Sequence, residues 1–482
     1  MNLDILKATR LIQGGMGAGV SNRGLARTVS SAGQAGVISG TGLLHVICRQ
    51  LQLGDLDGAI RLAIDNFPIP EGQKFLSEYF FEGGKPLEKP FKSVPMIDHI
   101  PSLRTMDLTI ISCFTEVWLA KLGHDGLVGM NLLEKLQYPH LPSLFGAILG
   151  GVDFIVVGAG MPTQFPEVIE RLSSFEAAEY KLTVGNGDFT MKFNPADVMS
   201  KDEFLRLNVQ KPMCLGIAST STIAQWLHRK SGKRYDGFVV ELPTAGGHNA
   251  PARGDALNAR GEPIYDLEGD DNPHFDIIRG IGLPFWIAGG QSSPEALRLA
   301  LELGATGVQL GTPFSFCRES GFLPEIKRRS IQEILAGSYD VFTDPKASPT
   351  GYPFKVVQRE GTLAMLDVYQ ARDRICDLGY LRTIKQVRKA TGEVDYVLSC
   401  PAEPVDDYTD KGGTLEETIG RKCICNALLA AIGLGQVRKN GCVELPIITS
   451  GDNCLFLKYI PICDDGLIGA KQVIDYMLGV AA

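Results

Sequence analysis

Short apolar runs recur along the first two thirds of the chain, and each run ends in glycine or in a small polar residue. A stretch with helical periodicity follows each run, in some cases after an insertion. This alternation predicts a parallel sheet with helices packed outside it. The predicted strands are 11–13, 36–38, 127–130, 154–157, 213–217, 238–242, 285–287 and 308–310.

Eight strand–loop–helix units are the number that closes a (β/α)₈ barrel, and roughly 320 residues suit such a barrel with insertions. Its active site is expected at the C-terminal ends of the strands, where the glycine turns fall. An open doubly wound sheet is the alternative. The N-terminal turn, G-G-M-G-A-G, lacks the G-x-G-x-x-G spacing of that fold, and no acidic partner follows a second strand. We therefore predict an α/β fold of the TIM-barrel type.

The predicted barrel covers residues 1–335, and three long segments interrupt it. Residues 50–105 and 249–275 are rich in proline, glycine or charged residues, and residues 181–212 have the pattern of an irregular or β-hairpin insertion. Loops of this length in a compact domain are usually lids or binding elements. The alternation stops after about residue 335, so residues 336–482 are predicted to form a Cys-rich, mainly helical C-terminal region.

Composition narrows the class of protein. The chain has 482 residues, 44% of them hydrophobic and 21% charged, which is typical of globular proteins. A net charge of −8 disfavours a nucleic-acid partner. No apolar run reaches the length of a membrane helix, and the N-terminus lacks the pattern of a signal peptide. We expect a cytoplasmic protein that acts on a small molecule, and self-association is left open.

Seven of the eleven cysteines lie in the C-terminal region. They are Cys376, Cys400, Cys423, Cys425, Cys442, Cys454 and Cys463. The C-x-C pair at 423–425 lacks the C-x-x-C spacing of common zinc and iron–sulfur sites, and free cysteine is a normal buried residue. We therefore expect reduced thiols and no metal ligand, with a metal or cluster site as the alternative.

The last two predicted strands end in glycine loops. One strand continues as I-A-G-G-Q-S-S-P-E-A-L-R, with Ala288, Gly289 and Gly290 before a predicted helix start. The other ends in V-Q-L-G-T-P-F, at Gly311 and Thr312. Backbone N–H groups and a helix N-terminus at these two loops are the common phosphate site of barrels, without any basic side chain. Plain packing turns are the alternative.

A histidine follows another strand, in the motif V-V-E-L-P-T-A-G-G-H. Gly246 and Gly247 bring the backbone close to a ligand, and His248 is then placed over it. A histidine at this position is suited to proton transfer near neutral pH. The alternative is a structural histidine, which we favour for most of the other six.

The first strand ends in Q-G-G-M-G-A-G-V-S. A turn with Gly15, Met16 and Gly17 can lie against a flat ring system, with the methionine as soft packing. A lone glycine-rich turn is weak evidence, and it gains weight only from the other strand ends.

These three motifs, in this order, resemble the nitronate monooxygenase (2-nitropropane dioxygenase) family and its relatives, the FMN-dependent enoyl-ACP reductases. The resemblance covers roughly residues 10–320, and its most specific part is A-G-G…G-A-x-G-V-Q-L-G-T. It implies FMN as cofactor, with its phosphate around Gly289, Gly290, Gly311 and Thr312. The isoalloxazine ring would lie near Gly15, Met16 and, from the family-like G-M-N-L, Asn131.

The resemblance also implies that His248 is the catalytic histidine. The full expected cofactor-binding set is Gly15, Met16, Gly17, Asn131, Gly158, Ser219, Gly246, Gly247, Ala288, Gly289, Gly290, Gly311 and Thr312. Some positions depart from the family. Thr244 stands where the family often has an acid, and Glu241 lies three residues earlier. The loop after His248 is longer than usual, and S-P-T-G-Y-P-F-K begins a large C-terminal extension.

Three functions follow as hypotheses. The first is an FMN enzyme that oxidises a nitronate or nitroalkane with O₂ to a carbonyl compound and nitrite, with His248 holding the nitro group or taking the α-proton. The second is an FMN reductase that uses NAD(P)H on an enoyl thioester of fatty-acid or polyketide synthesis, with an acyl carrier protein as partner. The third is a flavin-binding or scaffold protein without activity, because fold does not fix function.

Overall fold

The computed structural model describes residues 2–388 and 391–480. Its centre is an eight-stranded parallel sheet in the order β1–β10–β9–β8–β7–β4–β3–β2. The strands are β1 (Leu11–Gln13), β2 (Gly36–Ser39), β3 (Val128–Leu133), β4 (Phe154–Gly158), β7 (Met213–Ala218), β8 (Gly237–Glu241), β9 (Phe285–Ala288) and β10 (Gly307–Leu310). All eight strands predicted from the sequence are confirmed.

The sheet closes on itself between β1 and β2. Ile12 pairs with Ala35, directly before β2, in a parallel bridge. The N–H of Gln13 donates to the Ala35 carbonyl at 2.9 Å, and the N–H of Ala35 donates to the Leu11 carbonyl at 3.1 Å. The predicted (β/α)₈ barrel is therefore confirmed, and every strand points its C-terminal end to the same mouth.

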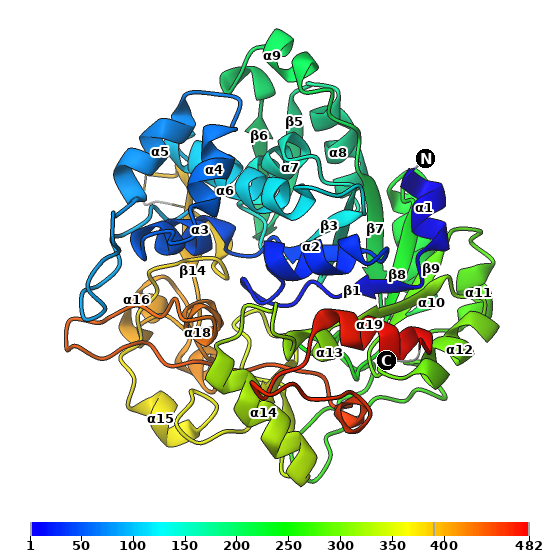
Figure 1. Cartoon of the computed structure of the whole chain (residues 1–482). Helices are drawn as coiled ribbons and strands as arrows, with labels where there is room; N and C mark the ends of the chain where they lie inside the picture. The colour runs from blue at the N-terminus through cyan, green and yellow to red at the C-terminus, as the bar shows by residue number, and fades with distance from the viewer. Residues whose placement is uncertain (1, 389–390, 481–482) are drawn as a thin grey trace.

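Helices connect the strands and cover the outside of the barrel (Figure 1). They are α2 (Arg23–Ser31), α6 (Leu103–Lys121), α7 (His140–Leu149), α8 (Phe165–Ser173), α10 (Ser221–Lys230), α11 (Phe275–Arg279), α12 (Pro294–Glu302), α13 (Thr312–Ser315) and α14 (Pro324–Ala336). Short polar side chains cap the N-termini of several of these helices. The oxygens of Asn22, Thr220 and Ser293 each accept a hydrogen bond from a backbone N–H in the first turn, which satisfies an otherwise unpaired donor.

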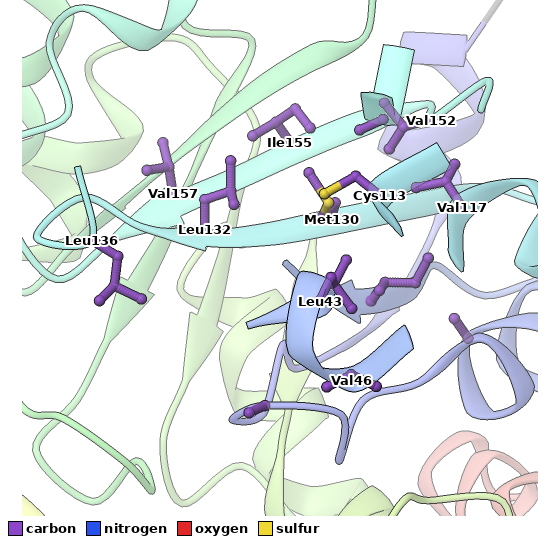
Figure 2. Close-up of a cluster of buried hydrophobic side chains, with 14 of the residues drawn as sticks. Leu43, Val46, Cys113, Val117, Met130, Leu132, Leu136, Val152, Ile155 and Val157 are labelled. Carbon is purple, nitrogen blue, oxygen red and sulfur yellow. The ribbon is translucent and has the colours of Figure 1, made fainter. Parts of the chain in front are cut away.

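Both faces of the sheet are buried, which explains why its strands are nearly continuous apolar runs. One set of side chains fills the barrel interior: Leu6, Ile12, Ala35, Val37, Leu127, Phe154, Val156, Met213, Leu215, Val239, Trp286 and Ala288. Alternate residues face the helices instead. Figure 2 shows part of that layer, with Met130, Ile155 and Val117 gathered between β3, β4 and α6.

The segments between barrel units have structure of their own. Helices α3 (Leu43–Gln52), α4 (Ala59–Asp65) and α5 (Glu71–Tyr79) precede α6. Strands β5 (Ala178–Gly185) and β6 (Gly187–Phe193) form an antiparallel hairpin in the region where the sequence predicted an irregular or hairpin insertion. This hairpin belongs to a separate four-stranded sheet, which β13 (Thr383–Arg388) and β14 (Val394–Ser399) complete. The hairpin insertion and the C-terminal region thus share one sheet.

Residues after 335 mix helices and strands, where the sequence predicted mainly helix. The strands β11 (Val341–Asp344) and β12 (Phe354–Val357) form an antiparallel pair. The helices are α15 (Leu366–Gln370), α16 (Val405–Asp410), α17 (Leu415–Thr418), α18 (Ile424–Ala431) and α19 (Ala470–Leu478). Helix α19, red in Figure 1, packs against α2 and α12, so the chain returns to the barrel wall. No helix among the described residues is long and apolar enough to span a membrane.

The barrel interior gives a stability prediction. Trp286 of β9 is fully buried in the interior cluster, and its indole N–H donates to the Thr9 carbonyl at 3.1 Å. Trp286→Ala should leave a large void and an unpaired acceptor, and lower the free energy of unfolding by about 3–5 kcal/mol. Thermal unfolding followed by circular dichroism measures the loss, with Trp226→Phe on the partly exposed face of α10 as the control. Equal melting temperatures for the two variants would contradict this description of the core.

Candidate functional site

A large cavity lies at the mouth of the barrel, against the C-terminal ends of the strands. About 210 Å³ of it is available to the centres of water molecules. Loops after β1, β3, β8, β9 and β10 form one side, and residues of the C-terminal region form the other. The site is therefore built by both parts of the chain, although the sequence motifs pointed only to the barrel.

Most residues predicted for the site line this cavity. They are Gly15, Met16, Gly17, Asn131, Gly246, Gly247, His248, Ala288, Gly289, Gly290, Gly311 and Thr312. The structure does not bring Gly158 and Ser219 to it. A Cβ on Gly158 would lie 2.6 Å from the Ile217 Cβ, so this glycine allows β4 and β7 to pack. Its neighbour Ala159 and Ile217 itself line the cavity instead.

The first glycine turn is held by a buried serine. The Ser21 hydroxyl donates to the Gly14 carbonyl at 2.7 Å and accepts from the Met16 N–H at 2.9 Å. Gln13 adds a bond from its side-chain amide to the same hydroxyl at 2.9 Å. These buried, mutually satisfied bonds fix the turn and keep its backbone at the cavity wall.

Two residues from different predicted motifs are in direct contact here. A Cβ added to Gly15 would lie only 2.1 Å from the Cβ of Asn131, which is on β3 and 6% exposed. Glycine is therefore required at position 15 because the asparagine occupies the space. The turn and Asn131 therefore meet at the wall of the cavity.

The two loops predicted to bind phosphate lie side by side, because β9 and β10 are paired neighbours. Gly289 has φ +88° and Gly290 has φ +68°, values that favour glycine. The loop leads into α12, where Ser293 caps the helix. None of the described residues that line the cavity is lysine or arginine. An anion there would depend on backbone N–H groups, hydroxyls and the helix dipole.

A segment far along the chain, residues 449–453, crosses these loops. The N–H of Gly451 donates to the Thr312 hydroxyl at 2.8 Å, and the N–H of Gly247 donates to the Thr449 hydroxyl at 3.0 Å. The Asn453 amide donates to the Gly290 carbonyl at 3.4 Å. A hydroxyl that accepts one bond still has its hydrogen to donate, so Thr312 keeps its capacity to bind an anion. Sequence reasoning missed this segment, since it follows no strand with a glycine turn.

His248 is positioned by a strand of the C-terminal region. Its backbone forms an antiparallel bridge with Phe354 of β12, and the two rings lie 4.7 Å apart between centroids. The Nε2 atom is 2.7 Å from the Ser348 hydroxyl, leaving Nδ1 as the nitrogen able to meet a bound molecule. Burial, together with the positive charge of Lys135, lowers the pKa of His248 well below its usual value. The imidazole is therefore neutral at physiological pH.

Two further ionisable groups lie close to this histidine. Glu241, at the end of β8, lines the cavity, and burial raises its pKa to about 7 against the opposing attraction of Lys135. Burial likewise lowers the pKa of Lys135 to about 7, although Glu134 and Glu241 favour its charged form. Groups that titrate near neutrality beside a cavity are typical of sites that move protons. The sequence analysis noted Glu241 as an acid three residues before Thr244, where the family often has one. It gave no signal for Lys135.

The wall opposite the barrel is apolar. Helix α18 contributes Ile424, Leu428 and Leu429, and Phe354 and Leu381 extend the same surface. A cavity with one polar backbone wall and one apolar wall suits a ligand with an anionic part and an uncharged organic part.

The cysteines of the C-terminal region are free thiols in the structure. Cys425 lines the main cavity, and Cys376, Cys400 and Cys423 pack together beside it. Burial raises the pKa of the Cys423 and Cys425 thiols. Within residues 2–388 and 391–480, no group of three or more His, Cys, Asp or Glu side chains is arranged to hold a metal ion.

Comparison with known proteins supports the resemblance drawn from the motifs. The chain matches no family model. A probable nitronate monooxygenase of Bacillus subtilis (strain 168) is 28% identical over 179 residues, which are 36% of this chain and 47% of that protein. The match thus spans about half the length of the relative. The predicted similarity to a nitronate monooxygenase is confirmed over that stretch.

Two solved structures that align with this chain are given for comparison. FabK from Thermotoga maritima has a TM-score of 0.47 and 15% identity, over 99% of this chain and 94% of that chain. Nitroalkane oxidase from Streptomyces ansochromogenes has a TM-score of 0.39 and 15% identity, over 74% of this chain and 78% of that chain.

The contact between Gly15 and Asn131 gives a prediction for the site. Gly15→Ala should destabilise the protein by about 1–3 kcal/mol, because the new methyl group overlaps the Asn131 side chain. Asn131→Gly removes the Cβ that it meets, so the double variant should lose less stability than the sum of the two single changes. Denaturant unfolding of all four proteins measures this coupling. Strict additivity would show that the two residues do not touch.

Proposed function

We propose that this protein is an FMN-dependent oxidoreductase that oxidises a nitronate or a nitroalkane, with O₂ as the electron acceptor, to a carbonyl compound and nitrite. The observation that carries the proposal is the meeting of the glycine loops of β9 and β10 with His248 around one cavity. The similarity to a probable nitronate monooxygenase supports the choice of reaction.

The residues at the cavity fit FMN. Gly289, Gly290, Gly311 and Thr312 would hold the phosphate through backbone N–H groups and a hydroxyl, at the barrel's usual phosphate loops. A Cβ at Gly247 would meet no atom within 4 Å, so a side chain there would take up space that the backbone leaves open. The turn at Gly15 and Met16, with Asn131 behind it, offers a flat, largely uncharged surface for the ring system.

The protein's own residues would bind and orient the substrate. FMN, when bound, supplies the redox chemistry. His248 is neutral and has one nitrogen engaged by Ser348, so its Nδ1 can donate to a nitro oxygen or accept an α-proton, depending on the tautomer. The apolar wall of α18 would bind the alkyl part and exclude water. The polar backbone loops would attract the anionic end.

A second function, reduction of an enoyl thioester by NAD(P)H, is favoured by one observation. The apolar wall consists of Ile424, Leu428, Leu429, Phe354 and Leu381. These side chains offer more apolar surface than a short nitroalkane needs. A hydrocarbon chain delivered by an acyl carrier protein would use it. His248 would then provide a hydrogen bond or a proton to the substrate.

The cofactor is tested by the visible spectrum of the purified protein and by titration with FMN. We expect oxidised-flavin absorbance with about one FMN per chain. Gly311→Val should lower FMN affinity by about tenfold or more, because the side chain would project toward Met16 and take up space at the cavity wall where the phosphate is expected. A colourless protein that does not take up added FMN would end the proposal.

The role of the histidine is tested by His248→Ala. FMN should remain bound, because the phosphate loops lie on other strands, whereas turnover should fall by about 10²-fold or more. His228→Ala, on α10 and outside the residues lining the cavity, is the matched control and should keep its activity. Turnover of the His248 variant equal to that of the control would remove His248 from the mechanism.

The two reactions are separated by anaerobic mixing. If the first proposal holds, a nitronate bleaches the flavin rapidly and NADPH alone does so slowly. Rapid bleaching by NADPH, followed by reoxidation with an enoyl thioester, would instead establish the reductase. If neither compound bleaches bound FMN, the protein binds a flavin without using it in either reaction.

A further inference from the structure

A row of hydrogen bonds leads from His248 out of the cavity to Lys135. His248 Nε2 lies 2.7 Å from the Ser348 hydroxyl, and that hydroxyl lies 2.8 Å from the Thr350 hydroxyl. The Lys135 ammonium donates to the Thr350 hydroxyl at 3.3 Å. The row connects the β8 loop, the C-terminal region and the loop after β3. No motif of the sequence predicted it, because its members are up to 215 residues apart, between 135 and 350.

A charged lysine allows one common direction for all bonds in this row. An ammonium group can only donate, so Thr350 accepts from Lys135 and has its own hydrogen left for Ser348. Ser348 already accepts from the Thr350 backbone N–H at 3.3 Å, and its single hydrogen then points to His248 Nε2. The imidazole consequently carries its proton on Nδ1 and presents a donor to the cavity.

Loss of a proton from Lys135 makes the opposite direction possible. A neutral amine accepts from the Thr350 hydroxyl, which accepts from Ser348, which accepts from an Nε2–H of the imidazole. Nδ1 then presents a lone pair to the cavity and can act as a base. Both directions satisfy every hydroxyl, which matters because Ser348 is fully buried.

We propose that Lys135, Thr350 and Ser348 form a proton relay that sets the tautomer of His248, and thereby decides whether the histidine acts as a hydrogen-bond donor or as a base. The use of this relay in catalysis rests on the proposed function. The three residues act through His248 and are positioning residues.

The proton balance is complete in both directions. When Nδ1–H gives its proton to a substrate, Nε2 takes one from Ser348, Ser348 takes one from Thr350, and Thr350 takes one from the Lys135 ammonium. The substrate gains one proton and the lysine loses one. When Nδ1 takes the α-proton of a nitroalkane, the same steps run in reverse, and the lysine gains the proton. No electrons move in the relay.

The surroundings of Lys135 place the reversal near neutral pH. Its ammonium group lies 3.4 Å from the centroid of the Tyr352 ring, and its pKa is about 7, lowered by burial and raised less strongly by Glu134 and Glu241. Burial keeps the pKa of His248 well below neutrality and raises that of Tyr352, so neither group titrates in this range. Glu241 also has a pKa of about 7, and its ionisation would hold the lysine charged to somewhat higher pH.

The direct test is ¹⁵N NMR of protein with labelled histidine, in which the two ring nitrogens report the tautomer. The His248 signals are identified by their loss in His248→Gln. We expect a change from the Nδ1–H to the Nε2–H tautomer as pH rises from about 5.5 to about 8.5, across the Lys135 pKa of about 7. Lys135→Arg keeps a permanent donor and should hold His248 as Nδ1–H throughout. Lys439→Met, an exposed lysine, is the control and should behave as the natural chain.

Two further variants keep the test decisive if Lys135→Arg does not fold. Thr350→Val and Ser348→Ala each remove one hydroxyl from the row, and both should abolish the pH-dependent change of tautomer. The relay is overturned if His248 of the natural chain keeps one tautomer across the pH range. It is also overturned if the change persists in folded variants that lack a relay group.

Kinetics tests the catalytic use separately. With a freshly dissolved neutral nitroalkane, kcat/KM should rise with pH through about 7, and Lys135→Arg should lose about tenfold or more at the high-pH end. Oxidation of the preformed nitronate needs no α-proton transfer and should change little. If the natural chain oxidises neither compound, the proposed function fails, whereas the NMR result still decides the relay.

Discussion

The closure of the barrel between β1 and β2 is the constraint on which the site depends. Three residues of β1 pair with β10 on one side, and hydrogen bonds through Ala35 join β1 to the β2 edge on the other. The pairing of β1 with β10 brings the turn at Gly15 and Met16 beside Gly311, although nearly 300 residues separate them in the sequence. A cavity with polar backbone on several sides can form only because all strand ends meet at one mouth.

The C-terminal region completes what the barrel begins. Strand β12 pairs with the histidine loop, and the buried Lys355 on that strand forms an ion pair with Asp452. Asp452 lies in the segment that crosses the glycine loops after β9 and β10, so one lysine links the position of His248 to that of Gly451. An ion pair with one buried partner is costly to break, which ties these two loops together. The region is thus a structural part of the cavity rather than an appendage.

The sequence predicted the barrel well because the signal is local. A strand buried on both faces must be apolar throughout, and the turn after it must be small or flexible. Most of the predicted site residues lie at one mouth for the same reason. Gly158 shows the limit, because the Ile217 side chain of the neighbouring strand β7 occupies the space beside this glycine at the cavity, a contact that no local pattern predicts. Here the neighbouring Ala159 lines the cavity.

Contacts between distant loops left no such signal. Ser348, Thr350 and the residues 449–453 follow no repeating pattern, and only the folded chain shows that they reach His248 or Thr312. The sequence alone would place Lys135 at the surface. In the structure, burial near Glu134, Glu241 and Tyr352 gives it a pKa near neutrality. The chemistry of the site therefore depends on side chains that no strand–turn motif identifies.

The central claim concerns where a flavin sits. A crystal structure of the protein grown with FMN tests it most directly. The account predicts the phosphate within hydrogen-bonding distance of the backbone N–H groups of Gly290 and Gly311, and the ring system between the Gly15–Met16 turn and His248. Electron density for FMN at any other place, or an empty cavity at saturating FMN, would contradict it.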